Sequence, residues 1–167
     1  GLFQLVFLLE FRGPNNGYSD NRRRQHHFLP KYTASARRPF HERFDGALRE
    51  LTWGELQDLA NQAANLLTSL GVSRGDRVAV VLPPTPEAAA VFFGTWKVGA
   101  ILLSMSVLYG DAGIQHRLDD SEPAVLITDA VNAPRFSGTA VAVLALDAER
   151  LAGESTEFET VDTAASD

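Results

Sequence analysis

The chain has 167 residues, of which 45% are apolar and 22% charged, and its net charge at pH 7 is −6. This length suits one globular domain at most, and the composition is ordinary for such a domain. The chain contains no cysteine, which excludes a disulfide framework and any metal site built on thiolates.

Charge divides the chain into two parts. Residues 1–46 carry eight Lys/Arg and four Asp/Glu, a net charge of +4, whereas residues 47–167 carry seven and seventeen, a net charge of −10. The acidic part has no electrostatic footprint for nucleic acid. We expect residues 1–46 to be an atypical lead-in, poorly ordered or misread, and residues 47–167 to form a partial α/β subdomain.

The apolar run at the start, Gly1–Phe11, is too short to cross a bilayer, which takes about twenty residues. It also lacks the basic segment before it and the small-residue cleavage site after it that mark a signal peptide. We therefore expect no membrane span. The residues that follow, 12–46, have no sustained helical or strand period.

Regular structure is expected to begin at Leu51 with a capped helix. Thr52 and Glu55 have the spacing of a capping box, in which each side chain bonds the backbone N–H of the other residue. Apolar residues then recur at three- and four-residue steps as far as Leu70, which predicts one buried helix face. Gly71 ends this helix.

Short apolar runs and helices alternate through the rest of the chain. Thr85 and Pro86 mark the start of the second helix. Thr85 can cap it, and Pro86 suits the first helical position, where a backbone N–H has no partner within the helix. The order predicts an α/β fold, a mostly parallel sheet with flanking helices. The predicted elements are strands Arg77–Leu82, Ile101–Val107, Ala124–Thr128 and Thr139–Leu146, and helices Pro86–Val98 and Tyr109–Pro123.

The residues show no self-contained catalytic set. The first strand is followed by Pro83-Pro84-Thr85-Pro86, which lacks the N–H donors of a phosphate cradle and matches neither the Rossmann nor the Walker motif. Ser137-Gly138-Thr139 is interpreted as a turn before a strand. No nucleophile elbow surrounds Ser104 or Ser106, and His26 and His27 lack metal-ligand spacing.

A resemblance to a known family runs through Leu51–Asp129. Its residues are Leu51-Thr52-Trp53 with Glu55-Leu56, Ala60-Asn61, Ala64-Asn65-Leu66-Leu67, Gly71-Val72 with Gly75-Asp76-Arg77, Leu82-Pro83 with Pro86-Glu87, Lys97 with Gly99-Ala100, Arg117-Leu118 with Asp120-Ser121, and Leu126–Asp129. In this order and spacing they resemble the N-terminal subdomain of the AMP-forming acyl-CoA synthetases. The stretch Ile101–Asp111 looks most like the acetyl- and medium-chain acyl-CoA synthetase branch. The likeness thins after Asp129 and is lost before Ala47.

The resemblance implies a ligase of fatty acid metabolism in the cytoplasm. Such an enzyme uses ATP and Mg²⁺ to convert a carboxylic acid to an acyl-adenylate, and CoA then displaces AMP. In related synthetases the segment that matches Ser106, Val107 and Leu108, and an arginine near Arg135, lie toward the CoA nucleotide. These four are the candidate cofactor-binding residues, and no catalytic or metal-binding residue is assigned.

Residues 161–167 resemble the approach to the family's phosphate loop, where this sequence stops. We therefore expect a fragment of the parent enzyme that is inactive alone and binds none of these cofactors tightly. The alternative is a non-catalytic binding or interaction module derived from the same fold. A Rossmann oxidoreductase is disfavoured because the glycine fingerprint is missing.

Overall fold

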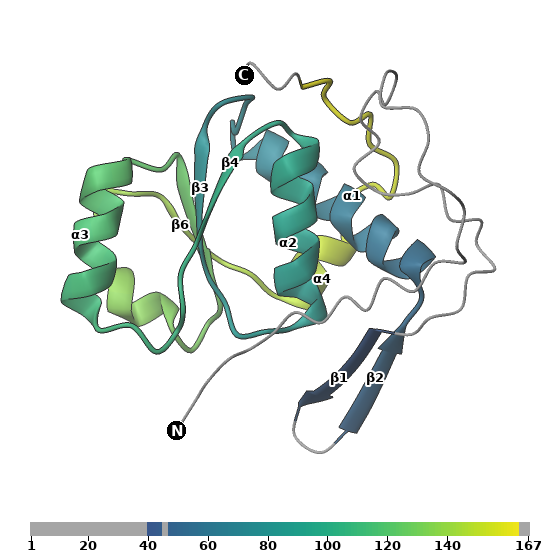
Figure 1. Ribbon diagram of the computed structural model, residues 1–167, viewed down its shortest axis with the longest axis horizontal. Coiled ribbons are helices and arrows are strands. Elements are labelled where there is room, and N and C mark those ends of the chain that lie inside the picture. Colours follow the sequence, from purple (N-terminus) through teal and green to yellow (C-terminus); the bar gives the residue numbers. More distant parts are fainter. Residues whose placement is uncertain (1–39, 45–46, 164–167) are drawn as a thin grey trace, which may run out of the picture.

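The computed structural model describes residues 40–44 and 47–163, and its centre is a four-stranded sheet (Figure 1). Every neighbouring pair of strands in this sheet is parallel, and the order is β4-β3-β5-β6. The strands are β3 (Arg77–Val81), β4 (Ile101–Ser104), β5 (Val125–Thr128) and β6 (Val143–Ala145). The mostly parallel sheet expected from the sequence is confirmed.

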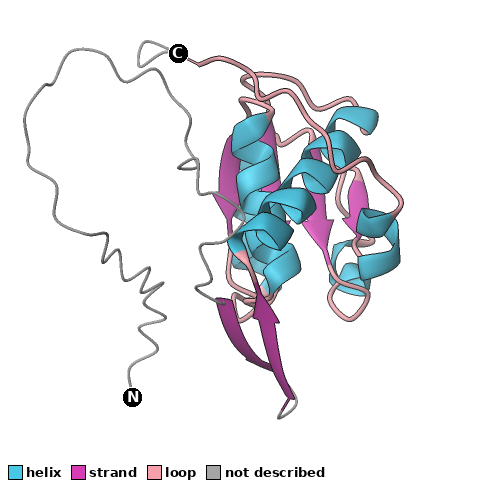
Figure 2. Ribbon diagram, turned by 90° about the vertical axis from the view of Figure 1, so that its right-hand side faces the viewer, coloured by secondary structure: helices cyan, strands magenta, loops and turns pink. Residues whose placement is uncertain are grey.

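Helices cover both faces of the sheet (Figures 1 and 2). One face packs against α1 (Trp53–Ser69), α2 (Pro86–Lys97) and α4 (Ala148–Ala152), and the other against α3 (Asp111–Ser121) and the short 3₁₀ helix η1 (Ala133–Phe136). Strand β3 shows how this arises from the sequence. Val78 and Val80 belong to the first cluster, and the alternate residues Ala79 and Val81 belong to the second. A run that is apolar at every position can therefore bury both of its sides.

The predicted capping box begins α1. The backbone N–H of Glu55 donates to the Thr52 hydroxyl at 3.2 Å, and the Thr52 N–H donates to the Glu55 carboxylate at 2.7 Å. The helix ends at Ser69, and Gly71 follows with a φ of +87°. This left-handed conformation is open to glycine because it has no Cβ, so the stop signal read from the sequence is confirmed.

Helices α1 and α2 pack closely against each other. Thr85 caps α2 by accepting from the Ala88 N–H at 3.2 Å, with Pro86 at the first helical position as expected. Further along α2, Gly94 lies against α1. A Cβ added there would stand 2.8 Å from the Ala63 Cβ and 2.8 Å from the Ala64 backbone nitrogen. The contact between the two helices therefore depends on a residue without a side chain.

Four strands differ from the expectation. Regular structure begins before Leu51, because β1 (Phe40–Phe44) and β2 (Ala47–Leu51) form an antiparallel hairpin. Hairpin pairing is a backbone property and needs no apolar period. The strand expected at Ile101–Val107 stops at Ser104, since the Met105 N–H makes the last bond to β3, at 2.8 Å to the Val80 carbonyl. The strand expected at Thr139–Leu146 shortens to β6.

Two short helices were not predicted, η1 and α4. Helix α4 is capped by Asp147, whose carboxylate accepts from the Arg150 N–H at 2.7 Å. Its Leu151 is fully buried in the cluster under α1. Among the residues described, no helix has both the length and the apolar character needed to cross a membrane. Of the predicted lead-in, residues 1–46, the structure describes only 40–44; residues 1–39 and 45–46 lie outside the described residues, as do residues 164–167.

Candidate functional site

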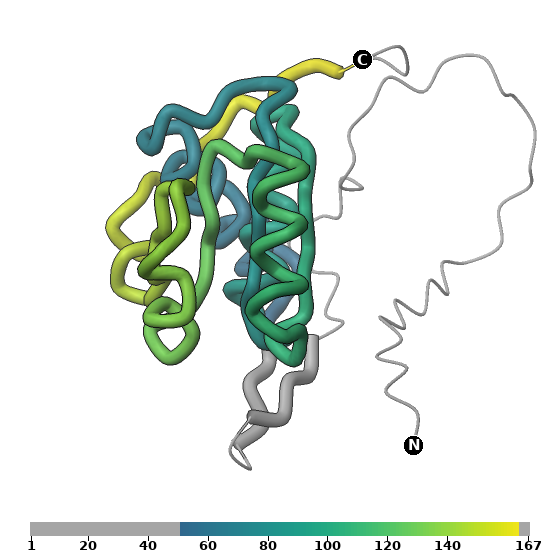
Figure 3. Tube along the Cα trace, turned by 90° about the vertical axis from the view of Figure 1, so that its left-hand side faces the viewer, coloured from purple at the N-terminus to yellow at the C-terminus, as the bar shows by residue number. Residues whose placement is uncertain are grey.

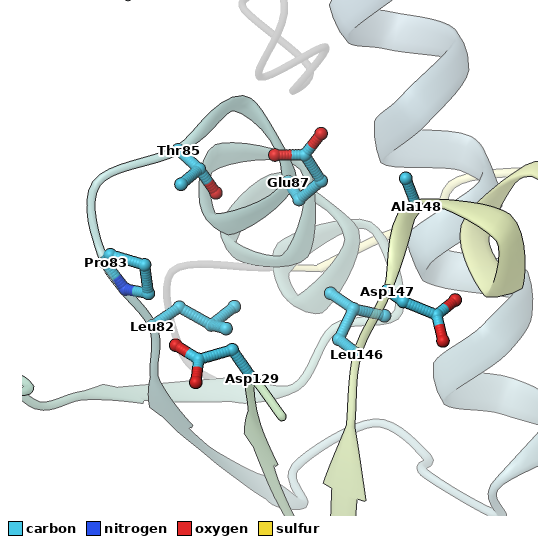
Figure 4. Close-up of a pocket in the computed structure, with 8 residues that line it drawn as sticks. All are labelled: Leu82, Pro83, Thr85, Glu87, Asp129, Leu146, Asp147 and Ala148. Carbon is cyan, nitrogen blue, oxygen red and sulfur yellow. The ribbon is translucent and has the colours of Figure 1, made fainter. Parts of the chain in front are cut away.

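The carboxyl ends of β3, β5 and β6 meet at one edge of the sheet, which is where open parallel sheets bind their ligands. A shallow pocket of about 200 Å³ opens at this edge (Figure 4). Its walls come from the residues that follow these three strands and from the first turn of α2. They are Leu82, Pro83, Thr85, Glu87, Asp129, Leu146, Asp147 and Ala148.

The charge of this pocket is negative. Its lining residues include the acids Glu87, Asp129 and Asp147 and no Lys or Arg. The Asp129 carboxylate accepts from the Asn132 backbone N–H at 2.7 Å, and Asp147 caps α4 with its carboxylate turned away from the pocket (Figure 4). A bound phosphate needs converging N–H donors or positive charge, and the pocket lining holds no positively charged side chain.

The residues after β3 and around η1 also lack a phosphate cradle. Pro83, Pro84 and Pro86 remove three backbone donors beside the end of β3. Ser137-Gly138 forms the turn expected there, with the Thr139 N–H donating to the Phe136 carbonyl at 3.1 Å. Within residues 40–44 and 47–163, no three His, Cys, Asp or Glu side chains are grouped so as to hold a metal ion.

A chain of polar contacts runs beside the pocket from β5 to the start of α3. The Asn132 amide donates to both oxygens of Asp129, at 3.1 and 3.0 Å, and its own oxygen accepts from Arg135 Nη1 at 2.9 Å. Arg135 Nε then donates to the Asp111 carboxylate at 2.8 Å. Three elements, β5, η1 and α3, are thus tied together at the carboxyl edge.

Arg135 also holds the loop between β4 and α3. Its Nη1 donates to the Val107 carbonyl at 3.0 Å and its Nη2 to the Tyr109 carbonyl at 2.6 Å. Within the loop, the Leu108 N–H donates to the Ser106 hydroxyl at 3.2 Å. The four residues singled out in the sequence, Ser106, Val107, Leu108 and Arg135, therefore lie in one connected structure.

The arrangement leaves apolar side chains facing solvent above this loop. Leu108 is 78% exposed, and Val131, in the turn after β5, is 86% exposed. The Arg117 guanidinium lies 5.0 Å from the centre of the Tyr109 ring, which holds the ring against α3. Because the Arg135 guanidinium bonds to backbone carbonyls, Asn132 and Asp111, its main effect is to fix the shape of the loop.

Sequence reasoning missed the bonding partners of Arg135. The Asp129–Asn132 contact has a local signal, since Asp side chains in turns often accept from a backbone N–H a few residues further on. The Arg135–Asp111 contact joins residues 24 positions apart, in two elements. The sequence of neither element indicates that the two pack together. Both aspartates belong to segments that resemble the family, but the resemblance gave them no role.

A comparison with protein families gives a direct result. The model for the family described as AMP-binding enzyme matches residues 31–166. The match begins before Ala47, where the likeness was expected to be lost, and it continues past Asp129, where the likeness was expected to thin.

Individual relatives and solved structures agree with the family match. The chain is 42% identical over 87 residues to an acetyl-coenzyme A synthetase of Streptomyces avermitilis, covering 50% of this chain and 13% of that protein. It is 37% identical over 114 residues to the phosphinothricin tripeptide synthetase PhsC of Streptomyces viridochromogenes, covering 68% and 10%. A crystal structure of a Brucella canis acyl-CoA synthetase superposes with a TM-score of 0.64 at 30% identity, covering 70% and 24%. The chain spans less than a fifth of the curated relatives it matches.

Proposed function

The chain belongs to the AMP-binding enzyme family, and from this premise we propose that it is the leading α/β subdomain, residues 47–167, of an AMP-forming acid–CoA ligase. The parent enzyme joins a carboxylic acid to ATP, giving an acyl-adenylate and pyrophosphate, and CoA then displaces AMP. The observation that carries the proposal is the 42% identity to an acetyl-coenzyme A synthetase. We propose that the parent works in the cytoplasm and takes a small-molecule acid.

In this proposal the loop Ser106–Leu108 faces the nucleotide end of CoA, and Arg135 fixes its shape. The support is the exposure of Leu108 together with the two carbonyls of the loop that Arg135 holds. A preorganised loop binds a ligand at a lower entropic cost than a mobile one. Arg135 acts here as a positioning residue, because its donors are directed at protein acceptors.

Among the described residues, no three His, Cys, Asp or Glu side chains are grouped to hold Mg²⁺. The pocket at the carboxyl edge holds no Lys or Arg for the phosphates of ATP, and three prolines remove N–H donors from the turn after β3. Electrostatic positioning supplies most of the catalysis in phosphate chemistry. We therefore propose that the 167-residue chain alone does not turn over and binds these cofactors weakly. ATP-dependent acyl-CoA formation by the purified chain would overturn this statement.

A sharper test of the ligase proposal uses the parent enzyme. Purified parent protein with acetate or a medium-chain acid, ATP, Mg²⁺ and CoA is expected to release AMP and form the acyl-CoA thioester. Leu108→Asp in that enzyme is expected to raise KM for CoA and leave the rate of pyrophosphate exchange unchanged, since the adenylation step precedes CoA. Equal losses in both half-reactions would contradict a CoA-facing loop.

A second candidate is an amino-acid-adenylating module of a peptide synthetase. It is favoured by the similarity to PhsC, which covers more of this chain than the acetyl-coenzyme A synthetase match does. Both candidates make an acyl-adenylate, and they differ in the thiol that takes the acyl group. Pyrophosphate exchange that depends on an amino acid and is followed by no CoA thioester would favour this second candidate.

A further inference from the structure

The last described segment, residues 154–163, lies across the outer side of α1 and is called the strap here (Figures 1 and 3). It follows α4 and reaches the turn between α2 and β4, where Gly99 lies close to Val161 and Thr163. The strap adds no strand to the sheet. Its attachment to the molecule therefore has to come from other contacts.

Three side-chain amides on consecutive turns of α1 hold the start of the strap. Asn61 Nδ2 donates to the Thr156 carbonyl at 2.6 Å, and Gln62 Nε2 donates to the Glu154 carbonyl at 3.2 Å. Asn65 Nδ2 donates to two strap carbonyls, those of Ser155 at 2.8 Å and Glu157 at 2.9 Å. Four successive strap residues thus each give their carbonyl to a helix amide.

These contacts recognise the main chain and no strap side chain. A hydrogen bond within the strap sets the position of these carbonyls. The Glu157 N–H donates to the Ser155 hydroxyl at 3.0 Å and forms a compact turn next to Asn65. Side-chain amides that bond carbonyls in this way resemble the main-chain pairing by which sheet edges bind extended peptides. The three amides therefore bind the main chain of a segment that is bent as residues 154–157 are.

Burial indicates that the amides are placed for this purpose. Asn61 is 7% exposed and Gln62 is 9% exposed, on a helix whose other buried positions are apolar. A buried amide destabilises the fold unless it is hydrogen-bonded. Among the described residues the strap carbonyls are the acceptors that the nitrogens of Asn61 and Gln62 find, while Asn61 Oδ1 has no donor there.

The strap has two further anchors. Phe158 packs against the apolar cluster under α1, and the Val161 N–H donates to the Lys97 carbonyl at 2.9 Å. The strap's other side chains are exposed or half-buried. Because no bond of the four-stranded sheet passes through the strap, its release would leave the hydrogen bonds of the sheet in place and withdraw only Phe158 from the apolar cluster.

We propose that Asn61, Gln62 and Asn65 form a main-chain-binding site whose ligand is a bent polypeptide segment, the chain's own residues 154–157. The site latches the strap as a unit that opens separately from the sheet, at a lower free energy than global unfolding. By holding the start of the strap, the site also fixes the position at which Val161 and Thr163 pass Gly99. This inference is independent of the proposed ligase function.

The test compares two amide-to-carboxylate changes on α1 by hydrogen exchange in the full chain. Asn65→Asp removes the donor and sets a negative charge against two carbonyls. Gln57→Glu makes the same chemical change on the exposed side of α1. In Asn65→Asp the Val161 amide proton is expected to exchange about tenfold or more faster, because two hydrogen bonds are lost. Amides of β3 and β5 should keep their rates, as should every amide in Gln57→Glu.

Two further results decide the proposal. Thr156→Ala and Glu157→Ala keep both carbonyls and are expected to leave Val161 exchange unchanged, because only the main chain is recognised. A faster rate in either would overturn main-chain recognition. Equal Val161 exchange rates in Asn65→Asp and Gln57→Glu would overturn the latch. An equal rise in the exchange rates of the β3 amides in Asn65→Asp would also overturn it, because the strap would then open only together with the sheet.

Discussion

The Arg135 guanidinium and the Asp111 carboxylate lie 2.8 Å apart and join η1 to the first residue of α3. The same guanidinium bonds the carbonyls of Val107 and Tyr109, so one side chain holds both ends of the loop between them. Asp111 is in addition well placed at the N-terminus of α3, where a negative charge is favourable. The loop at the carboxyl edge is therefore fixed before any ligand arrives.

Replacing Arg135 is expected to destabilise the fold measurably. Arg135→Ala should lower the free energy of unfolding by about 1–3 kcal/mol, because several hydrogen bonds of a charged donor are lost together. Arg135→Lys should retain only part of the free energy of unfolding that Arg135→Ala loses, since an ammonium group cannot reach all the acceptors that the guanidinium bonds. Urea denaturation measures both. Asp111→Asn is the control and should cost less than about 1 kcal/mol, because the Asp111 side chain is 69% exposed.

Two glycines on neighbouring helices should respond in opposite ways to alanine. Gly94→Ala drives a Cβ to within 2.8 Å of α1 backbone and side-chain atoms, so we expect a loss of about 1–3 kcal/mol. Gly54→Ala, whose nearest neighbour lies 3.8 Å away, should stabilise α1 by about 0.5–1 kcal/mol. Thermal melts of both variants test the pair. A neutral Gly94→Ala would show that the helices separate without cost.

The hydroxyl of Thr128 makes a buried hydrogen bond to the Val81 carbonyl at 2.9 Å, and its residue is fully buried. Thr128→Val preserves shape and removes this bond, so we expect a loss of about 1 kcal/mol in denaturant unfolding. Thr68→Val is the matched control, because Thr68 bonds within its own helix near the exposed end of α1. The prediction is wrong if both variants unfold at the same urea concentration.

The capping box should make stability depend on pH. The Thr52 N–H, and next its hydroxyl, donate to the Glu55 carboxylate and lower the pKa of Glu55 below its ordinary value. Because the folded pKa is the lower one, ionised Glu55 stabilises the fold above the pKa of the unfolded chain. This stabilisation is lost as pH falls through the folded pKa. The melting-temperature difference between wild type and Glu55→Gln should be constant from about pH 7 to 5 and shrink below about pH 4. A difference that grows toward acid would contradict it.

The helix starts and the sheet could be predicted because their signals are local. Thr52, Glu55 and Thr85 cap helices through residues three positions away, and the apolar run at Val78–Val81 specifies burial on both sides. The strap could not be predicted in this way. Its bonds join residues 90–95 positions apart, and nothing near Asn65 reveals what its amide will meet.

The candidate site was partly predicted, and only through the family resemblance. The resemblance placed Ser106–Leu108 and Arg135 together, and in the structure Arg135 of η1 is hydrogen-bonded to the loop that holds the other three. Their role toward CoA stays a prediction. The acidic pocket lined by Glu87 and Asp129 was not expected, because it forms only when three strand ends meet.

The position of β3 has a consequence for the growing chain on the ribosome. β3 is synthesised before the other strands of its sheet, yet it ends between β4 and β5. When it emerges, α1 is already available to cover one side, and α2 follows before a second strand exists. The side of β3 with Ala79 and Val81 stays uncovered until α3 has been synthesised. A nascent chain stalled between α2 and α3 would therefore expose unpaired strand edges. We expect this intermediate to aggregate more readily than shorter or longer nascent chains.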